Sequence, residues 1–159
     1  LLGVLNSRVM SFHAKNVCPP KQSGTFRINL EALNRFPIVG KSDSTVEGHV
    51  RQIRADVAAL GAASDKFKKL VCAEYSITWP PRLVAWWELD APELIKKIKV
   101  KIPLKAKAEF IEYWEGEAEV CRALAAKIET TERALDDRVF DLYRVSPADR
   151  ATINAWFDA

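Results

Sequence analysis

Glycine is scarce and scattered in this chain, and its distribution excludes the usual phosphate-binding turns. The 159 residues include 6 glycines, at positions 3, 24, 40, 48, 61 and 116. No two of them have the spacing of a GxGxxG turn or a Walker loop, in which close glycines let backbone amides approach phosphate oxygens. We therefore expect no site of this kind here for a dinucleotide, a nucleoside triphosphate or S-adenosylmethionine.

Histidine and cysteine are also few. The chain has His13 and His49, and it has Cys18, Cys72 and Cys121. None of them has a His or Cys partner at zinc-ligand spacing, and no CxxC pair occurs. His13 lies near Cys18 in sequence, but no third group is present to orient a thiol–imidazole pair, so a surface histidine is favoured. We expect no catalytic residue and no metal site, and we expect reduced thiols, as in a cytoplasmic protein.

Long apolar runs are missing as well. No stretch approaches the roughly 18 apolar residues that a membrane-spanning helix needs, and no secretory leader is recognisable. We therefore expect no membrane partner. The sequence opens on Leu1-Leu2-Gly3-Val4-Leu5 without a Met. We interpret this opening as the middle of an apolar helix, and we expect a larger protein whose missing part lies upstream.

Charge is unevenly distributed along the chain. The net charge is +3, but residues 1–107 hold 18 Lys and Arg against 9 Asp and Glu, whereas residues 108–159 hold 6 against 12. A basic first two-thirds is typical of a surface that faces an acidic partner such as DNA. The alternative is ordinary variation over a solvated surface, and charge alone does not decide between them.

The region 44–71 carries the pattern of a long helix. Ser44 and Glu47 have capping-box spacing. The seam positions then follow at steps of four and three, which is the heptad spacing that turns one stripe toward a partner helix. Gly61 weakens the middle of this helix, so a kink or break is expected near residues 61–64. The seam consists of Val46, Val50, Ile53, Val57, Leu60, Ser64, Phe67 and Val71.

A second long helix is expected from about Ala106 to Val145, again with apolar residues at threes and fours. Neither helix can bury its stripe alone, so we predict that the two pack as a long antiparallel, coiled-coil-like hairpin. The alternative is that both stripes face a general core. Shorter helices are predicted after the caps Asp90 and Ser146. The second stripe consists of Phe110, Trp114, Cys121, Leu124, Ile128, Leu135, Val139 and Leu142.

The first 43 residues have a different pattern. A helix is predicted over 1–14, a loop over 16–24 and a short alternating strand over 25–29. The predicted fold is therefore mainly α, with a small α+β remnant at the N-terminus.

A polar excursion before that strand is the best candidate for a binding site. Asn, Gln, Ser and Arg are the side chains that read base edges, and Lys contacts the phosphate backbone. Polar loops are common, so residue type alone is a weak indication. The candidate DNA-binding residues are Lys15, Asn16, Lys21, Gln22, Ser23 and Arg27.

A second basic segment follows the predicted helix at residue 90. Six lysines occur without an intervening acid. They fit either contacts with phosphates or lysine stems that cover a helix end and a loop, and the sequence favours neither. They are Lys96, Lys97, Lys99, Lys101, Lys105 and Lys107.

Three segments near the N-terminus resemble the target-recognition region of TaqI-like adenine-specific DNA methyltransferases. These segments are Leu1 to Arg8, Ser23 to Ile28 and Leu33 to Ile38. Later segments resemble the C-terminal tail of large methyltransferases from type IIG restriction systems and phage-defence enzymes. They are Trp87 to Asp90, Lys101 to Lys105, Trp114, Ala134 to Tyr143, Ser146-Pro147 and Ile153.

This resemblance implies a parent enzyme that transfers a methyl group from S-adenosylmethionine to adenine in a specific sequence, after flipping the base from the duplex. The cofactor and the catalytic motifs would belong to the missing upstream domain, with none in this chain. Residues 1–43 would be the distal part of the recognition region, and residues 44–159 a helical C-terminal domain. Double-stranded DNA and the methyltransferase domain would be the partners. The alternative is a helical protein–protein interaction module unrelated to DNA.

Overall fold

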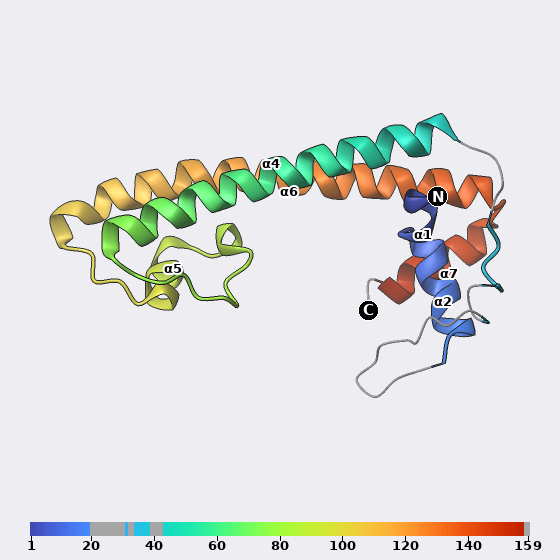
Figure 1. Cartoon of the computed structure of the whole chain (residues 1–159), viewed down its shortest axis with the longest axis horizontal. Coiled ribbons are helices and arrows are strands. Elements are labelled where there is room, and N and C mark those ends of the chain that lie inside the picture. The colour runs from blue at the N-terminus through green and yellow to red at the C-terminus, as the bar shows by residue number, and fades with distance from the viewer. Residues whose placement is uncertain (20–30, 32–33, 39–42, 158–159) are drawn as a thin grey trace. The chain divides into compact units, whose positions relative to one another are not determined.

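The structure is a computed structural model that describes residues 1–19, 31, 34–38 and 43–157. No strand occurs among these residues, and most of them are helical (Figure 1). The predicted mainly α class is confirmed. The predicted strand over 25–29 lies outside the described residues. The elements are α1 (Leu2–Leu5), α2 (Arg8–Val17), α4 (Ser44–Tyr75), η1 (Trp86–Glu88), α5 (Ala91–Ile98), α6 (Leu104–Leu142) and α7 (Pro147–Phe157).

The chain forms two compact units. Unit 1 contains Leu1–Ile53 and Thr130–Ala159, and unit 2 contains Arg54–Glu129. Each unit therefore takes one part of α4 and one part of α6. The division at residue 43 into a recognition part and a helical part concerns function, and it stays a prediction.

The long helices pack antiparallel, as predicted. In unit 2, Lys66 pairs with Glu117 at 2.5 Å, and Asp56 pairs with Lys127 at 2.8 Å. A residue nearer the N-terminus of α4 thus pairs with a residue nearer the C-terminus of α6, which is the antiparallel arrangement. In unit 1, Val46 of α4 and Leu135 and Val139 of α6 share one apolar core.

Unit 2 is built around an aromatic stack. Phe67 of α4 is fully buried, and its ring lies 3.8 Å from the Trp86 ring, nearly parallel to it. The Trp86 indole N–H donates to the hydroxyl of buried Ser64 at 3.0 Å. A polar residue therefore occupies an apolar seam position because the indole needs an acceptor when it is buried. Leu94 and Ile98 of α5 complete this core.

The predicted seam is wrong at one position of α4. Val57 is 51% exposed, whereas its neighbour Asp56 is 5% exposed and pairs with Lys127. A straight α-helix drifts by about 20° per heptad relative to a 3.5-residue repeat, so a strict heptad stripe does not stay on the contact face. The predicted break near Gly61 is also wrong, because α4 is continuous from Ser44 to Tyr75.

The single helix predicted over 1–14 is two helices. Ser7, which is fully buried, separates them and caps α2. Its hydroxyl donates to the Val4 carbonyl at 2.7 Å and accepts from the Met10 amide at 3.4 Å. A side chain that satisfies the end of one helix and the start of the next favours a break at that point.

Caps and ends differ in detail from the predictions. Asp43, rather than Ser44, caps α4, since its carboxylate accepts from the Val46 amide at 2.9 Å. Helix α6 begins at Leu104 and ends at Leu142, inside the predicted C-terminal limit. The caps at Asp90 and Ser146 are confirmed, since each side chain accepts from the backbone amide three residues on.

Candidate nucleic-acid interface

Two of the six predicted DNA-binding residues lie in the last turn of α2. Lys15 and Asn16 are both exposed. The other four, Lys21, Gln22, Ser23 and Arg27, lie outside the described residues. Lys15 and Asn16 are adjacent and on a helix, whereas the sequence pattern predicts a loop that begins at Asn16.

Helix α2 is held firmly at its N-terminal end. Ser7 caps it, and the Arg8 amide donates to the Asp136 carboxylate of α6 at 2.8 Å. Met10, which is 1% exposed, anchors the inner face in the core of unit 1. The far end of α2 therefore presents its polar side chains from a fixed support rather than from a free loop.

Lys15 rests on an aromatic ring from the opposite end of the sequence. Its ammonium lies 4.3 Å from the centre of the Trp156 ring of α7. Phe12, one turn earlier on α2, meets the same indole edge to face at 6.0 Å. Lys15 has no ion pair with any described residue. An ammonium that rests on an indole still has N–H donors available for an anion.

Asn16 keeps part of its hydrogen-bonding edge free. One amide hydrogen donates to the Phe12 carbonyl at 2.8 Å. The second amide hydrogen and the side-chain carbonyl oxygen remain, and that donor and acceptor together are what an Asn uses to read adenine in the major groove. Lys15 and Asn16 therefore combine a phosphate-binding group and a base-reading group on one helical turn.

The segment 34–38 lies against α2. The His13 Nε2 atom is 3.1 Å from the Arg35 carbonyl oxygen, and the His13 ring meets Phe36 edge to face at 5.4 Å. The Tyr143 hydroxyl donates to the Pro37 carbonyl. His13 is half-buried and serves as a support for this segment. The Phe36-Pro37-Ile38 landmark of the resemblance thus lies next to the helix that carries Lys15.

A polar hollow of about 400 Å³ adjoins the base of α2, and sequence reasoning missed it. The Arg8 guanidinium lies 3.5 Å from the Asp136 carboxylate, donates to the Asn154 side-chain oxygen at 3.2 Å and covers the Phe157 ring. Burial raises the pKa of Asp136 above its usual value, and the Arg8 amide and guanidinium oppose that rise. Arg8 and Asp136 are separated by 128 positions in the sequence, so no local pattern would pair them.

The thiols lie singly and are not oxidised to disulfides. Cys18, Cys72 and Cys121 are free, and burial raises the pKa of the Cys121 thiol. No group of His, Cys, Asp and Glu side chains within the described ranges is arranged to hold a metal ion. Within the same residues, no helix combines the length and the apolar character needed to cross a bilayer.

Comparison with known proteins identifies a family for the chain. No curated protein and no solved structure showed significant similarity to the chain. One family model, described as a domain of unknown function (DUF8810), matches residues 40–139. The match spans α4, η1, α5 and most of α6, and it leaves Lys15 and Asn16 outside. Because it covers more than half of the sequence, the chain belongs to the DUF8810 family.

Proposed function

We propose that this chain is the DNA-recognition and scaffold part of a site-specific adenine DNA methyltransferase of restriction–modification or phage defence. The observation that carries the proposal is the presence of two complementary side chains, Lys15 and Asn16, at the end of α2. Lys15 is held over Trp156 without a carboxylate partner among the described residues, and Asn16 keeps a donor and an acceptor for a base edge. The resemblance of the flanking segments to TaqI-like recognition regions supports the same assignment.

In this proposal the two long helices brace the recognition unit against the methyltransferase domain. The Arg8–Asp136 contact supports such a role, because it ties α2 directly to α6. S-adenosylmethionine and the residues that transfer the methyl group would belong to the upstream domain. We further propose a cytoplasmic location, which the three free cysteines support.

The alternative, a helical module that pairs with another protein, has less support. Its basis was the pair of heptad stripes, and these stripes pack on each other within the chain. Exposed apolar residues remain on both long helices, notably Leu70 and Val120, each 49% exposed. Isolated exposed apolar side chains of this kind are ordinary on protein surfaces.

Fluorescence anisotropy with a labelled duplex that contains the parent enzyme's target sequence tests the proposal. We expect Lys15→Gln to weaken binding to all sequences alike and to reduce the slope of log K against log salt by about 1. We expect Asn16→Ala to cost about 1–3 kcal/mol on the target duplex and much less on a scrambled one.

Lys69→Gln is the matched control, since it removes an exposed lysine from α4. It should leave both the affinity and the salt slope nearly unchanged. If the chain fails to bind duplex DNA even at low salt, or if Asn16→Ala weakens target and scrambled duplexes equally, the recognition role is wrong.

A further inference from the structure

Unit 2 carries a separate basic surface, and we infer that it binds the phosphate backbone of duplex DNA without regard to sequence. This surface, named here the lysine patch, runs from the end of α5 to the first turns of α6. All six of its lysines are exposed. They are Lys96, Lys97, Lys99, Lys101, Lys105 and Lys107.

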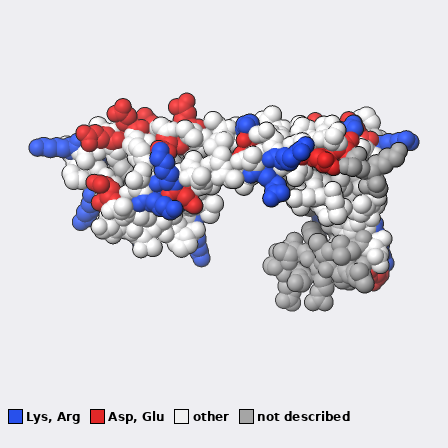
Figure 2. All heavy atoms as spheres, turned by 45° about the horizontal axis from the view of Figure 1, so that its top comes forward, with Lys and Arg blue, Asp and Glu red and all other residues white. Residues whose placement is uncertain are grey.

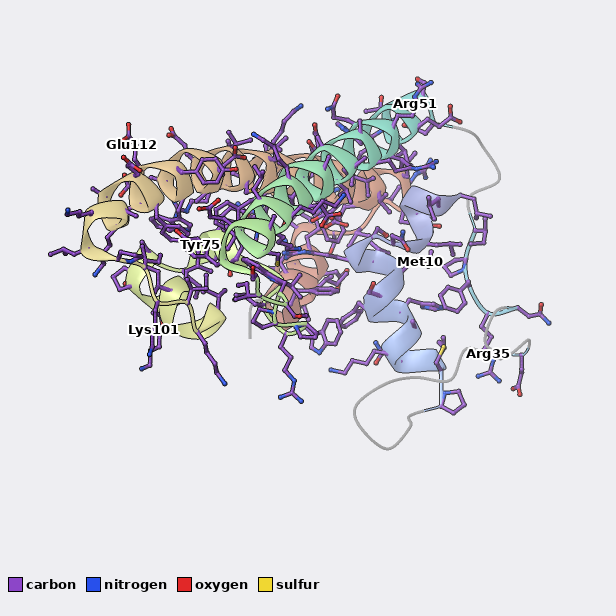
Figure 3. The ribbon with its side chains drawn as sticks, turned by 60° about the vertical axis from the view of Figure 1, so that its left-hand side comes forward. Met10, Arg35, Arg51, Tyr75, Lys101 and Glu112 are labelled. Carbon is purple, nitrogen blue, oxygen red and sulfur yellow. The ribbon has the colours of Figure 1, made fainter. Side chains whose placement is uncertain are left out.

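Apolar residues that lie between the lysines hold the backbone of the patch against the core of unit 2. Ile98 is buried, and Val100 and Ile102 pack against the core of unit 2. Lys99 and Lys101 lie between them and are exposed. Lys99 ends α5 in the left-handed backbone conformation (φ 58°). Because Ile98, Val100 and Ile102 pack on the core, Lys99 and Lys101 are left on the solvent side. Figure 3 shows Lys101 on the side of this region that faces away from α4 and α6.

The lysines are not neutralised from within the chain. None of the six forms an ion pair with another described residue, whereas Lys66 and Lys127 of the same unit do. The nearest acids in sequence are Glu93 and Glu109, on either side of the run. In Figure 2, many red side chains of unit 2 lie along its upper edge, and blue ones project from its outer end and its lower side, where some red ones also lie.

The helix that follows adds to this positive field. Helix α6 has no acidic residue in its first turn, which instead carries Lys105. The N-terminal end of a helix is itself positive, so a lysine there is electrostatically unfavourable in isolation. The arrangement becomes favourable when an extended anion lies across the lysines and the helix start together.

The chemistry of the patch fits a backbone rather than bases. Lysine ammonium groups act as point charges, and the patch lacks the Arg, Asn and Gln side chains that form bidentate contacts with base edges. Such a surface favours a regularly charged polyanion. The choice of duplex DNA among polyanions rests on the proposed function, but the patch itself is distinct from Lys15 and Asn16.

A competing occupant is an anionic membrane surface. Leu104 is 87% exposed between Lys101 and Lys105, and an apolar residue among lysines is one feature of interfacial membrane binding. The apolar face of α5 is buried, however, since Leu94 and Ile98 lie in the core. The patch therefore lacks the continuous apolar face that such helices insert, and DNA is the favoured partner.

The test compares two triple variants of the full chain on a random-sequence duplex over a range of salt concentrations. The first is Lys99→Gln/Lys101→Gln/Lys105→Gln. The second is the control Arg51→Gln/Arg54→Gln/Lys69→Gln, which removes the same charge from exposed positions of α4. Each phosphate contact contributes about 0.9 to the salt slope. We expect the first variant to reduce the slope by about 2 to 3 and the control to change it little.

Additional variants distinguish a failure of this inference from a failure of the proposed function. Lys→Arg changes at the three patch positions should retain binding, because the charge is kept. A patch variant that loses random-duplex binding while Asn16→Ala has no sequence-specific effect would support the patch and refute the recognition role. Equal slopes for the patch variant and the control would overturn the inference. So would patch-dependent binding to phosphatidylserine vesicles with none to DNA.

Discussion

Asp43 has two roles at the beginning of α4, and both depend on its charge. Its carboxylate caps the helix at the Val46 amide and accepts two hydrogen bonds from the Arg138 guanidinium of α6. The hydrogen bond from Arg138, followed by that from Val46, lowers the pKa of Asp43. A carboxyl whose pKa is lower in the folded state stabilises the fold above its unfolded pKa, and that contribution is lost as the pH falls through the folded value.

Asp43→Asn should therefore destabilise the chain in a pH-dependent way. Asparagine caps a helix about as well as aspartate, so the change isolates the charge. We expect urea denaturation to show a lower free energy of unfolding for the variant at pH 7. The difference from the parent should shrink as the pH falls below about 4, the usual unfolded value for Asp.

Asp136→Asn provides a control whose effect on stability should change with pH in the opposite direction. Burial raises the pKa of Asp136 in the folded state, so its contribution to stability is greatest below the unfolded pKa and declines as the pH rises through the folded value. Relative to the parent, this variant should gain stability as the pH rises. A deficit for Asp43→Asn that stayed constant from pH 7 to pH 3 would refute the charge-based account.

The glycines of the helices differ in whether a side chain would fit. A Cβ at Gly61 or Gly116 would meet nothing within 4 Å, whereas one at Gly3 would lie 2.7 Å from Val50 and 2.9 Å from Val46. Gly3 therefore allows α1 to approach α4 closely. Gly61 and Gly116 have no such packing role. Their backbones are freer in the unfolded chain than those of any other residue type, so a glycine at these positions costs more conformational entropy on folding.

Alanine substitutions at these sites should have opposite effects on stability. Gly61→Ala and Gly116→Ala should each raise the free energy of unfolding by roughly 0.5–1 kcal/mol. Gly3→Ala should lower it by about 1–3 kcal/mol, because the added methyl overpacks the contact with α4. Thermal and urea unfolding measure both. A gain in stability for Gly3→Ala would show that α1 does not pack on α4 as described.

Helical elements were largely predictable because their apolar spacing is local. Residues only three or four apart define the apolar stripes of α4 and α6, and the same holds for the caps at Asp90 and Ser146. The exchange of Val57 for Asp56 on the contact face has two causes: the drift of a straight helix from the heptad repeat, and a partner, Lys127, that lies 71 residues away and that local spacing does not reveal. The break at Ser7 was missed for a different reason: Leu5 and Val9, which lie on either side of it at helical spacing, suggest one continuous helix and conceal its capping role.

The candidate site was predictable in residue type but not in setting. Lys15 and Asn16 were identified from their polar chemistry, and that part needs no tertiary information. The support beneath them depends on α7, since the Trp156 ring under Lys15 comes from the other end of the sequence. Unit 1, which joins the two ends of the sequence, must fold before these two side chains are presented on this support. A fragment ending before α7 would keep both residues and lose this support.

The whole molecule should be a monomer in solution. The apolar stripes of the two long helices pack mainly within one chain, so the described residues leave no continuous heptad face for a second copy. We expect light scattering to give a mass of 17.9 kDa over a wide range of protein concentration. A stable dimer that Leu70→Gln or Val120→Gln dissociates would instead favour the protein-interaction function. A monomer whose DNA binding weakens as salt rises favours a DNA-binding role over the protein-interaction function, because such dependence reports Lys and Arg contacts with phosphates.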